Sequence, residues 1–278
     1  MVSLADGRKV QVEELGDPDG VPALWFHGAF SSRLEAAPLD APARELGVRL
    51  LSLDRAGVGG SDPLPGRTAV GYAADVAEVL DALDLDKVAV GGLSNGGMYA
   101  MCVASVHPER VLRAVPVNPS TPVADPTARA ALSLKGRISY RLIGRQTDRI
   151  ASYLTQGKAP GRFTSALNRR SNPDAHLADD PAIAAMQAAT LAEVLRQPVR
   201  EYLRTEVGHC TGPWGFDHRA VSVPVTIVSG DKDGGLGYAR VWARELPQGR
   251  LVTVPGGHGG MPAPAVSRRV VELLAGQP

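Results

Sequence analysis

Short apolar runs alternate with longer amphipathic stretches over residues 1–118, and the same alternation returns from residue 223 onward. The apolar runs are typical of strands in a buried parallel sheet, except that the first alternates apolar and polar residues as an edge strand does. These predicted strands lie at residues 8–15, 23–26, 48–53, 88–90, 111–117, 223–228 and 251–254. The amphipathic stretches predict helices at residues 31–46, 68–83, 236–246 and 262–274. This order predicts an α/β fold with a mostly parallel central sheet flanked by helices.

The stretch from residue 119 to residue 222 breaks this alternation, because it contains helical patterns but no convincing strand. It enters the chain at the carboxyl edge of the predicted sheet, where α/β folds commonly bind their ligands. We therefore expect residues 1–118 and 223–278 to form one α/β core and residues 119–222 to form a helical cap inserted over its site.

The composition excludes several classes of protein. A net charge of +1 gives no global field toward nucleic acid or a membrane surface, and 5% aromatic residues argue against base stacking. Cys102 and Cys210 make no disulfide framework, and the histidines and carboxylates show no metal-ligand spacing. No apolar run reaches transmembrane length, and residues 1–9 lack the pattern of a signal peptide. We expect a cytoplasmic protein with no cofactor, no metal, no nucleic acid and no membrane partner.

One stretch, residues 87–100, carries the clearest chemical pattern. A β-branched run leads into Gly92-Leu93-Ser94-Asn95-Gly96, and a helical pattern follows. This order predicts a strand, a sharp turn and a helix, with Ser94 at the apex in a strained backbone conformation. Glycine two residues to each side removes the Cβ atoms that would otherwise clash. The Ser94 hydroxyl is thus expected at the carboxyl end of a strand, beside a helix N-terminus, as a candidate nucleophile.

Five motifs each follow a predicted strand: His27-Gly28, Asp54 to Ser61, Gly92 to Gly97, Gly230-Asp231-Lys232-Asp233 and Gly256-Gly257-His258. Through these motifs and their order, the chain resembles the α/β-hydrolase fold family over nearly its whole length. Together these motifs are specific for the fold and not for a substrate. The resemblance implies a catalytic serine, an acid and a histidine in that chain order.

The resemblance assigns a role to each member of this triad. Ser94 is the expected nucleophile, and a hydroxyl needs an adjacent base, for which His258 is the candidate. Asp233 is the expected acid that orients His258, and Asp231 stays open as an alternative. Asp125 is only a remote option. The family often continues after the acid with Val-Pro, whereas this chain has Gly234-Gly235, so the acid loop is expected to be mobile.

The family geometry also implies an oxyanion hole formed by the backbone N–H groups of Ala29 and Asn95. His27 is expected to hold the loop that carries Ala29. The Asn95 side chain either contacts substrate or occupies a strained backbone site, and the sequence leaves these two interpretations open. Phe30 is expected in the substrate pocket, as a donor or as packing over the acyl group. Trp214 is the second pocket candidate, although anchoring of the cap to the core is the favoured interpretation of this residue.

The expected cap is unusually basic. Residues 125–172 contain ten Lys or Arg and two Asp, and Arg137, Arg141, Arg145 and Arg149 share one face of a predicted helix. A solvated face is the favoured interpretation of this row. The alternative is docking of an anionic group, either an anionic small substrate or one tethered to an acidic carrier protein.

These observations predict a serine hydrolase that cleaves an ester, thioester or lactone of a small acyl substrate through an acyl-enzyme on Ser94. An alternative keeps the triad without hydrolysis, as in acyl transfer, cyclisation, a lyase or a perhydrolase, because fold does not fix function. A non-enzymatic ligand receptor is a third hypothesis, which the apparently intact triad argues against.

Overall fold

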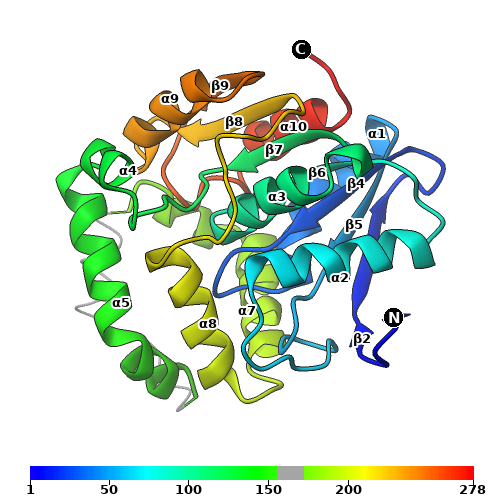
Figure 1. Cartoon of the computed structure of the whole chain (residues 1–278), viewed down its shortest axis with the longest axis horizontal. Coiled ribbons are helices and arrows are strands. Elements are labelled where there is room, and N and C mark those ends of the chain that lie inside the picture. The colour runs from blue at the N-terminus through cyan, green and yellow to red at the C-terminus, as the bar shows by residue number, and fades with distance from the viewer. Residues whose placement is uncertain (156–171) are drawn as a thin grey trace.

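A computed structural model describes residues 1–155 and 172–278 and contains a seven-stranded sheet in the order β3-β5-β4-β6-β7-β8-β9 (Figure 1). The strands are β3 (Val12–Gly16), β4 (Val21–Phe26), β5 (Val48–Leu53), β6 (Val88–Leu93), β7 (Val111–Val117), β8 (Val225–Gly230) and β9 (Gly249–Val254). β3 pairs antiparallel to β5, and the other pairs are parallel. The predicted fold class is confirmed.

Helices cover both faces of the sheet. They are η1 (Arg33–Leu39), α1 (Asp40–Glu45), α2 (Ala69–Ala82), α3 (Asn95–Val106), η2 (Pro108–Arg110), α9 (Leu236–Glu245) and α10 (Pro264–Leu274). Alternating side chains of each strand enter two separate cores: Leu24 and Phe26 pack toward α2 and α3, whereas Ala23 and Trp25 pack toward η1, α1 and α10. A strand buried on both faces explains the continuous apolar runs in the sequence.

Two predicted elements differ from the structure. The expected edge strand at residues 8–15 is divided, because β2 (Lys9–Val10) pairs with β1 (Val2–Ser3) in a small separate sheet. Between β2 and β3, the N–H of Gln11 donates to the Ser61 hydroxyl and not to a strand partner. The expected helix at residues 31–46 is a 3₁₀ segment followed by a short α-helix, since Pro38 lacks the N–H that a continuous α-helix would use.

The stretch between β7 and β8, which we call the insert, is helical where it is described. It contains α4 (Pro126–Ala131), α5 (Leu134–Thr155), η3 (Ala175–Asp179), α7 (Pro181–Val194) and α8 (Val199–Thr211). In the figure, α5, α7 and α8 lie together beside one edge of the core, where α8 packs on α3 and α7 packs on η1 (Figure 1). The division into core and cap domains stays a prediction. The basic residues expected at 158–170 lie outside the described residues.

The turn between β6 and α3 has the strain that the sequence predicts. Ser94 has φ 56° and ψ −116°, a backbone conformation that residues other than glycine rarely adopt. A Cβ on Gly92 would lie 2.4 Å from the carbonyl carbon of Gly96. A Cβ on Gly96 would lie 1.7 Å from the carbonyl oxygen of Phe26, at the end of the neighbouring strand β4. Both glycines are therefore required for α3 to begin this close to the sheet.

Replacement of Gly96 tests this packing. We expect Gly96→Ala to lower the free energy of unfolding by about 3 kcal/mol, because the Phe26 carbonyl belongs to a buried strand and cannot move aside. Gly208→Ala is the matched control, since a Cβ at this position in α8 meets nothing within 4 Å. Alanine favours a helix over glycine, so the control should gain about 0.5–1 kcal/mol. Thermal and denaturant unfolding measure both, and a Gly96→Ala protein as stable as wild type would contradict the packing argument.

Candidate active site

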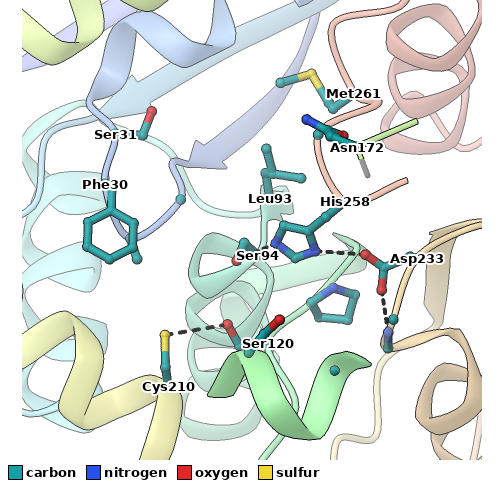
Figure 2. Close-up of a pocket in the computed structure, with 18 of the residues that line it drawn as sticks. Phe30, Ser31, Leu93, Ser94, Ser120, Asn172, Cys210, Asp233, His258 and Met261 are labelled. Atoms are coloured by element: carbon teal, nitrogen blue, oxygen red, sulfur yellow. Dashed lines mark hydrogen bonds and ion pairs between the residues drawn. The ribbon is translucent and has the colours of Figure 1, made fainter. Parts of the chain in front are cut away.

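Ser94, Asp233 and His258 follow β6, β8 and β9, whose carboxyl ends meet at one edge of the sheet. The Ser94 hydroxyl lies 2.9 Å from Nε2 of His258. Nδ1 of His258 lies 2.8 Å from Oδ2 of Asp233 (Figure 2). With a proton on Nδ1, His258 donates to Asp233 and its Nε2 accepts from the Ser94 hydroxyl. The structure thus brings the three predicted triad residues into one hydrogen-bonded chain.

The environment tunes the two ionisable members of this chain. Desolvation lowers the pKa of His258, but the hydrogen bond and negative charge of Asp233 outweigh it and raise this pKa above its ordinary value of 6.5. Burial is the largest influence on Asp233 and raises its pKa, but the hydrogen bond and charge of His258 and the N–H of Gly235 together outweigh it, so the net pKa lies below the ordinary value. Asp233 is therefore a carboxylate and His258 a stronger base than a free imidazole.

The structure also separates the two candidate acids. Asp233 reaches His258, and its other oxygen accepts the N–H of Gly235 at 2.6 Å. Asp231 instead accepts the N–H of Gly256 at 3.0 Å and so ties the acid loop to the histidine loop. The Gly234-Gly235 departure from the family pattern thus places a backbone donor against the acid.

Two residues that the sequence analysis did not single out hold the His258 loop. The side chain of Asn118, at the end of β7, donates to the carbonyls of Gly257 and His258 at 3.0 Å each. Asp174, which precedes η3 in the insert, accepts the N–H groups of Gly257 and Gly259 at 2.8 and 3.0 Å. Asn118 has φ 40°, but neither residue belongs to a recognisable motif.

The loop that follows β4 carries the first predicted oxyanion donor. His27 is buried, donates from Nδ1 to the Gly28 carbonyl at 2.9 Å and accepts the Arg55 N–H at Nε2. Burial and the nearby Arg55 charge lower the pKa of His27 well below its ordinary value, so it is a neutral structural group. The Gly28 N–H donates to the buried Glu35 carboxylate. Among the residues that the structure describes, the Ala29 N–H has no partner and remains available to a ligand.

The Asn95 side chain contradicts both interpretations that the sequence left open. It does not face a substrate, because it is fully buried and its four hydrogen-bonding positions are occupied. Nδ2 donates to the backbone carbonyl and the carboxylate of Glu206, and Oδ1 accepts from Ser120 and Cys210. Nor does Asn95 occupy the strained site, which is Ser94. Its backbone N–H, at the first residue of α3, remains the second candidate oxyanion donor.

A cavity of about 950 Å³ opens above Ser94 and His258. Phe30 lines it, as predicted, and is partly exposed. The core side also contributes Gly28, Ala29, Leu93 and Met261. The insert contributes Leu132, Tyr140, Ile143, Met186, Thr190, Leu191 and Cys210. The wall above the triad is mainly apolar, with hydroxyl groups and the amides of Asn172 and Gln187 as its uncharged polar groups, which suits an uncharged organic group.

Trp214 does not line this cavity, so its assignment to the substrate pocket is wrong. The indole is buried, stacks on Phe216 and packs against His218 and Trp242 in the core between the sheet and α9. Its large apolar surface is more stable there than at a wet pocket rim. Its packing agrees with the anchoring role, which was the favoured interpretation.

The arginine row lies on the exposed face of α5, whereas Gly136, Tyr140 and Ile143 on the opposite face line the cavity. None of the four arginines borders the cavity, which removes them as a site for an anionic substrate group. Docking of an acidic partner protein on the outer face stays a prediction.

No group of three or more His, Cys, Asp or Glu within residues 1–155 and 172–278 is placed to hold a metal ion. In the same part of the chain, no helix combines the length and apolar character needed to cross a lipid bilayer.

The sequence profile of the alpha/beta hydrolase fold family matches residues 22–261, and the chain therefore belongs to this family. It is similar to a non-heme chloroperoxidase from Streptomyces lividans, at 36% identity over 44% of this chain and 45% of the relative. It is also similar to a proline iminopeptidase from Neisseria gonorrhoeae, at 31% identity over 40% of this chain and 36% of the relative. The chain thus spans less than half the length of either relative.

A solved structure agrees with this assignment over the whole chain. A thermophilic esterase from Thermogutta terrifontis covers 98% of this chain and 97% of its own, with a TM-score of 0.73 and 22% identity, which shows a shared fold. The protein is an enzyme of the alpha/beta hydrolase superfamily.

The pKa of His258 tests the geometry without any substrate. We expect this pKa to lie above 6.5 in the wild type. In Asp233→Asn it should fall, because the hydrogen bond and the negative charge that raise it are lost. Asp231→Asn is the matched control and should leave the pKa of His258 raised. NMR titration of labelled histidines, assigned with His258→Gln, measures it, and equal shifts in the two variants would show that Asp233 is not the partner.

Proposed function

We propose that this enzyme is a serine hydrolase that cleaves an ester-type bond of a small acyl compound through an acyl-enzyme on Ser94. The observation that carries the proposal is the hydrogen-bonded chain from Ser94 through His258 to Asp233 at the base of the cavity. A hydroxyl needs such a base, and a base needs an orienting acid, for nucleophilic catalysis at neutral pH.

In the acylation step, Nε2 of His258 takes the Ser94 proton as Oγ attacks the substrate carbonyl carbon. The carbonyl oxygen becomes an oxyanion that accepts the N–H groups of Ala29 and Asn95, beside the N-terminus of α3. The bond to the leaving oxygen then breaks, and His258 returns the proton to that oxygen. Asp233 stabilises the imidazolium while the proton is on His258.

In the deacylation step, water enters the cavity and His258 removes its proton as it attacks the acyl carbon. The second tetrahedral intermediate collapses, the proton returns to Ser94, and the carboxylic acid leaves. Since His258 must be neutral in both steps and its pKa is raised, turnover should fall as the pH drops through a value above 6.5.

The cavity wall supports an uncharged acyl group. Leu132, Ile143 and Leu191 supply apolar contact from the insert, and hydroxyl groups such as those of Ser139 and Thr190 offer few, weak polar contacts. Among the described residues that line the cavity, Lys232 is the only lysine or arginine, and it lies between Asp231 and Asp233 in the sequence. This charge balance favours neutral esters, thioesters or lactones over anionic substrates.

The Streptomyces lividans relative is named a non-heme chloroperoxidase, which favours reaction with peroxide as a second candidate function. Hydrogen peroxide in place of water would take the acyl group from Ser94, giving a peracid and restoring the serine hydroxyl. The same triad serves both reactions, because only the second nucleophile differs.

Replacement of the nucleophile tests the proposal. Ser94→Ala should lose turnover of p-nitrophenyl acetate and butyrate by about 10⁴-fold or more while it unfolds at the wild-type temperature. A fluorophosphonate probe should label Ser94 in the wild type, as read by peptide mass. Ser105→Ala is the control, because this serine also lies on α3 and its hydroxyl donates to the Asp217 carbonyl, away from the cavity. Wild-type turnover by Ser94→Ala would refute the mechanism.

Competition between water and peroxide separates the two candidate functions. If hydrolysis is the main reaction, adding millimolar hydrogen peroxide should leave carboxylic acid as the main product of a simple ester. Peracid as the main product at that concentration would favour the second candidate. Trapping of the peracid by a thioether, with product analysis by mass spectrometry, measures the ratio, and Ser94→Ala should form neither product.

A further inference from the structure

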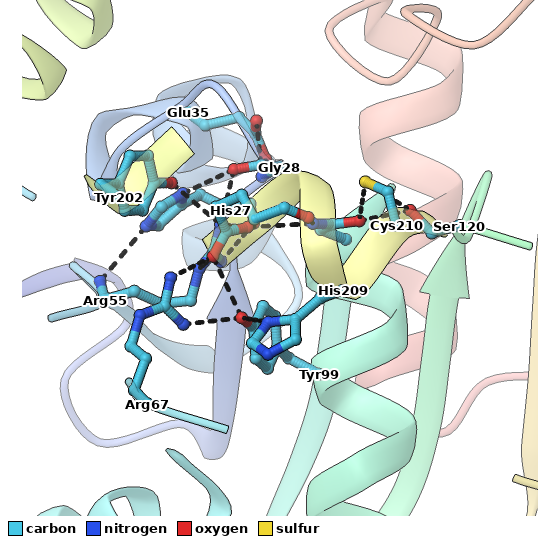
Figure 3. A network of polar contacts seen from close by, with 12 residues as sticks. His27, Gly28, Glu35, Arg55, Arg67, Tyr99, Ser120, Tyr202, His209 and Cys210 are labelled. Atoms are coloured by element: carbon cyan, nitrogen blue, oxygen red, sulfur yellow. Dashed lines mark hydrogen bonds and ion pairs between the residues drawn. The ribbon is translucent and has the colours of Figure 1, made fainter. Parts of the chain in front are cut away.

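A buried ionic cluster connects α8 of the insert with the loop that carries His27 and Gly28 (Figure 3). Its centre is Glu206 on α8, whose side chain is fully buried. Arg55 donates to both carboxylate oxygens, at 3.1 and 3.0 Å, and Arg67 donates to one of them. The Tyr99 hydroxyl donates to the same oxygen at 3.0 Å. Burial alone would raise the pKa of Glu206. The charges of Arg55 and Arg67, with the hydrogen bonds from Asn95 and Arg67, outweigh burial and bring this pKa well below its ordinary value, so the group is a carboxylate.

The first branch of this cluster reaches the loop after β4. Arg55 is fully buried and donates to the carbonyl of His27 at 2.5 Å and to the carbonyl of Gly28 at 2.7 Å. In a planar trans peptide, the N–H of the next residue points opposite to that carbonyl. Holding the Gly28 carbonyl against Arg55 therefore turns the Ala29 N–H away from the buried guanidinium, toward the cavity that Ala29 lines.

The second branch reaches the start of α3. Asn95 Nδ2 donates to the Glu206 carboxylate and to its backbone carbonyl, both at 3.0 Å. Ser120 and Cys210 occupy the other side of the same amide. These hydrogen bonds hold the Asn95 side chain in one orientation. They also hold the Asn95 backbone, whose N–H comes directly after Ser94.

We infer that Glu206 is a positioning residue that sets both donors of the oxyanion hole from the insert, through Arg55 to Ala29 and through the side chain of Asn95. The inference rests on the proposed function, because an oxyanion hole matters only if a tetrahedral intermediate forms. Glu206 does not line the cavity and its hydrogen bonds go to Arg55, Arg67, Asn95 and Tyr99, so its effect is on the placement of donors that stabilise the transition state.

The test uses a ligand that reports on the oxyanion hole directly. A trifluoromethyl ketone adds to Ser94 and places its oxyanion in the hole, whereas the matching secondary alcohol fills the cavity without one. In Glu206→Gln, we expect kcat/KM for p-nitrophenyl butyrate and the ketone affinity to fall together, by about 100-fold. KM and the alcohol affinity should change less than about threefold, and the acidic pKa of the pH profile should stay at its wild-type value.

A second variant covers the case in which Glu206→Gln does not fold, because it leaves two buried arginines without a carboxylate. Asn95→Ala keeps the backbone N–H and every Glu206–arginine pair, and removes one tether. We expect it to lose about tenfold in kcat/KM and in ketone affinity. Glu193→Gln is the matched control: it removes another ion pair between insert and core, with Arg33, and touches neither donor. It should keep wild-type ketone affinity.

The outcomes separate the inference from the proposed function. Folded Glu206→Gln or Asn95→Ala protein with wild-type ketone affinity would overturn the positioning role of Glu206 and leave the serine mechanism intact. An equal loss in Glu193→Gln would also overturn it, because the effect would then come from loosening the insert in general. Wild-type protein that neither turns over esters nor is labelled at Ser94 would refute the proposed function itself.

Discussion

The contact between the start of α3 and the end of β4 is the constraint on which the rest of the site depends. The backbone of Gly96 lies so close to the Phe26 carbonyl that no side chain fits between them. This closeness holds Ser94 at a positive φ and brings the loop after β4 beside the residue after the nucleophile. One packing contact thus places the nucleophile and both candidate oxyanion donors, while the adjacent strand ends bring Asp233 and His258 to the same edge.

Much of this arrangement could be predicted because it is encoded locally. Ser94, Asp233 and His258 each follow a buried strand, and parallel strands deliver their carboxyl ends to one edge whatever the loops between them. The glycines around Ser94 carry their own steric reason. By contrast, Glu206 lies on a helix and Asp174 in the turn before η3, both without a motif and far along the chain from the segments that they hold. Their role depends on how the insert packs, and no spacing rule reports that.

Side-chain directions were harder to predict than positions along the chain, for a related reason. Four-residue spacing shows that the arginines of α5 share a face, yet it does not say whether that face meets the cavity or water. Likewise, a Trp-Gly-Phe segment at the end of the insert indicates a large apolar surface to bury, but the partner, Trp242 on α9, is visible only in the fold. Asn95 was misjudged because a polar side chain near a nucleophile suggests substrate contact, whereas its partners, Ser120, Glu206 and Cys210, all come from later in the chain.

The insert divides its work between geometry and selectivity. Two of its acidic side chains, Glu206 and Asp174, bind core segments, and the surface that the insert presents to the cavity is mainly apolar. Burying Glu206 between two arginines adds little to the free energy of unfolding, because desolvation offsets most of the Coulomb attraction. Such a cluster is justified if it fixes dipoles that act on a developing charge, since preorganised donors need no reorganisation during the reaction. Under the proposed mechanism, the shape of the apolar wall would select the acyl group and the Glu206 cluster would set the rate, so one set of helices would control both.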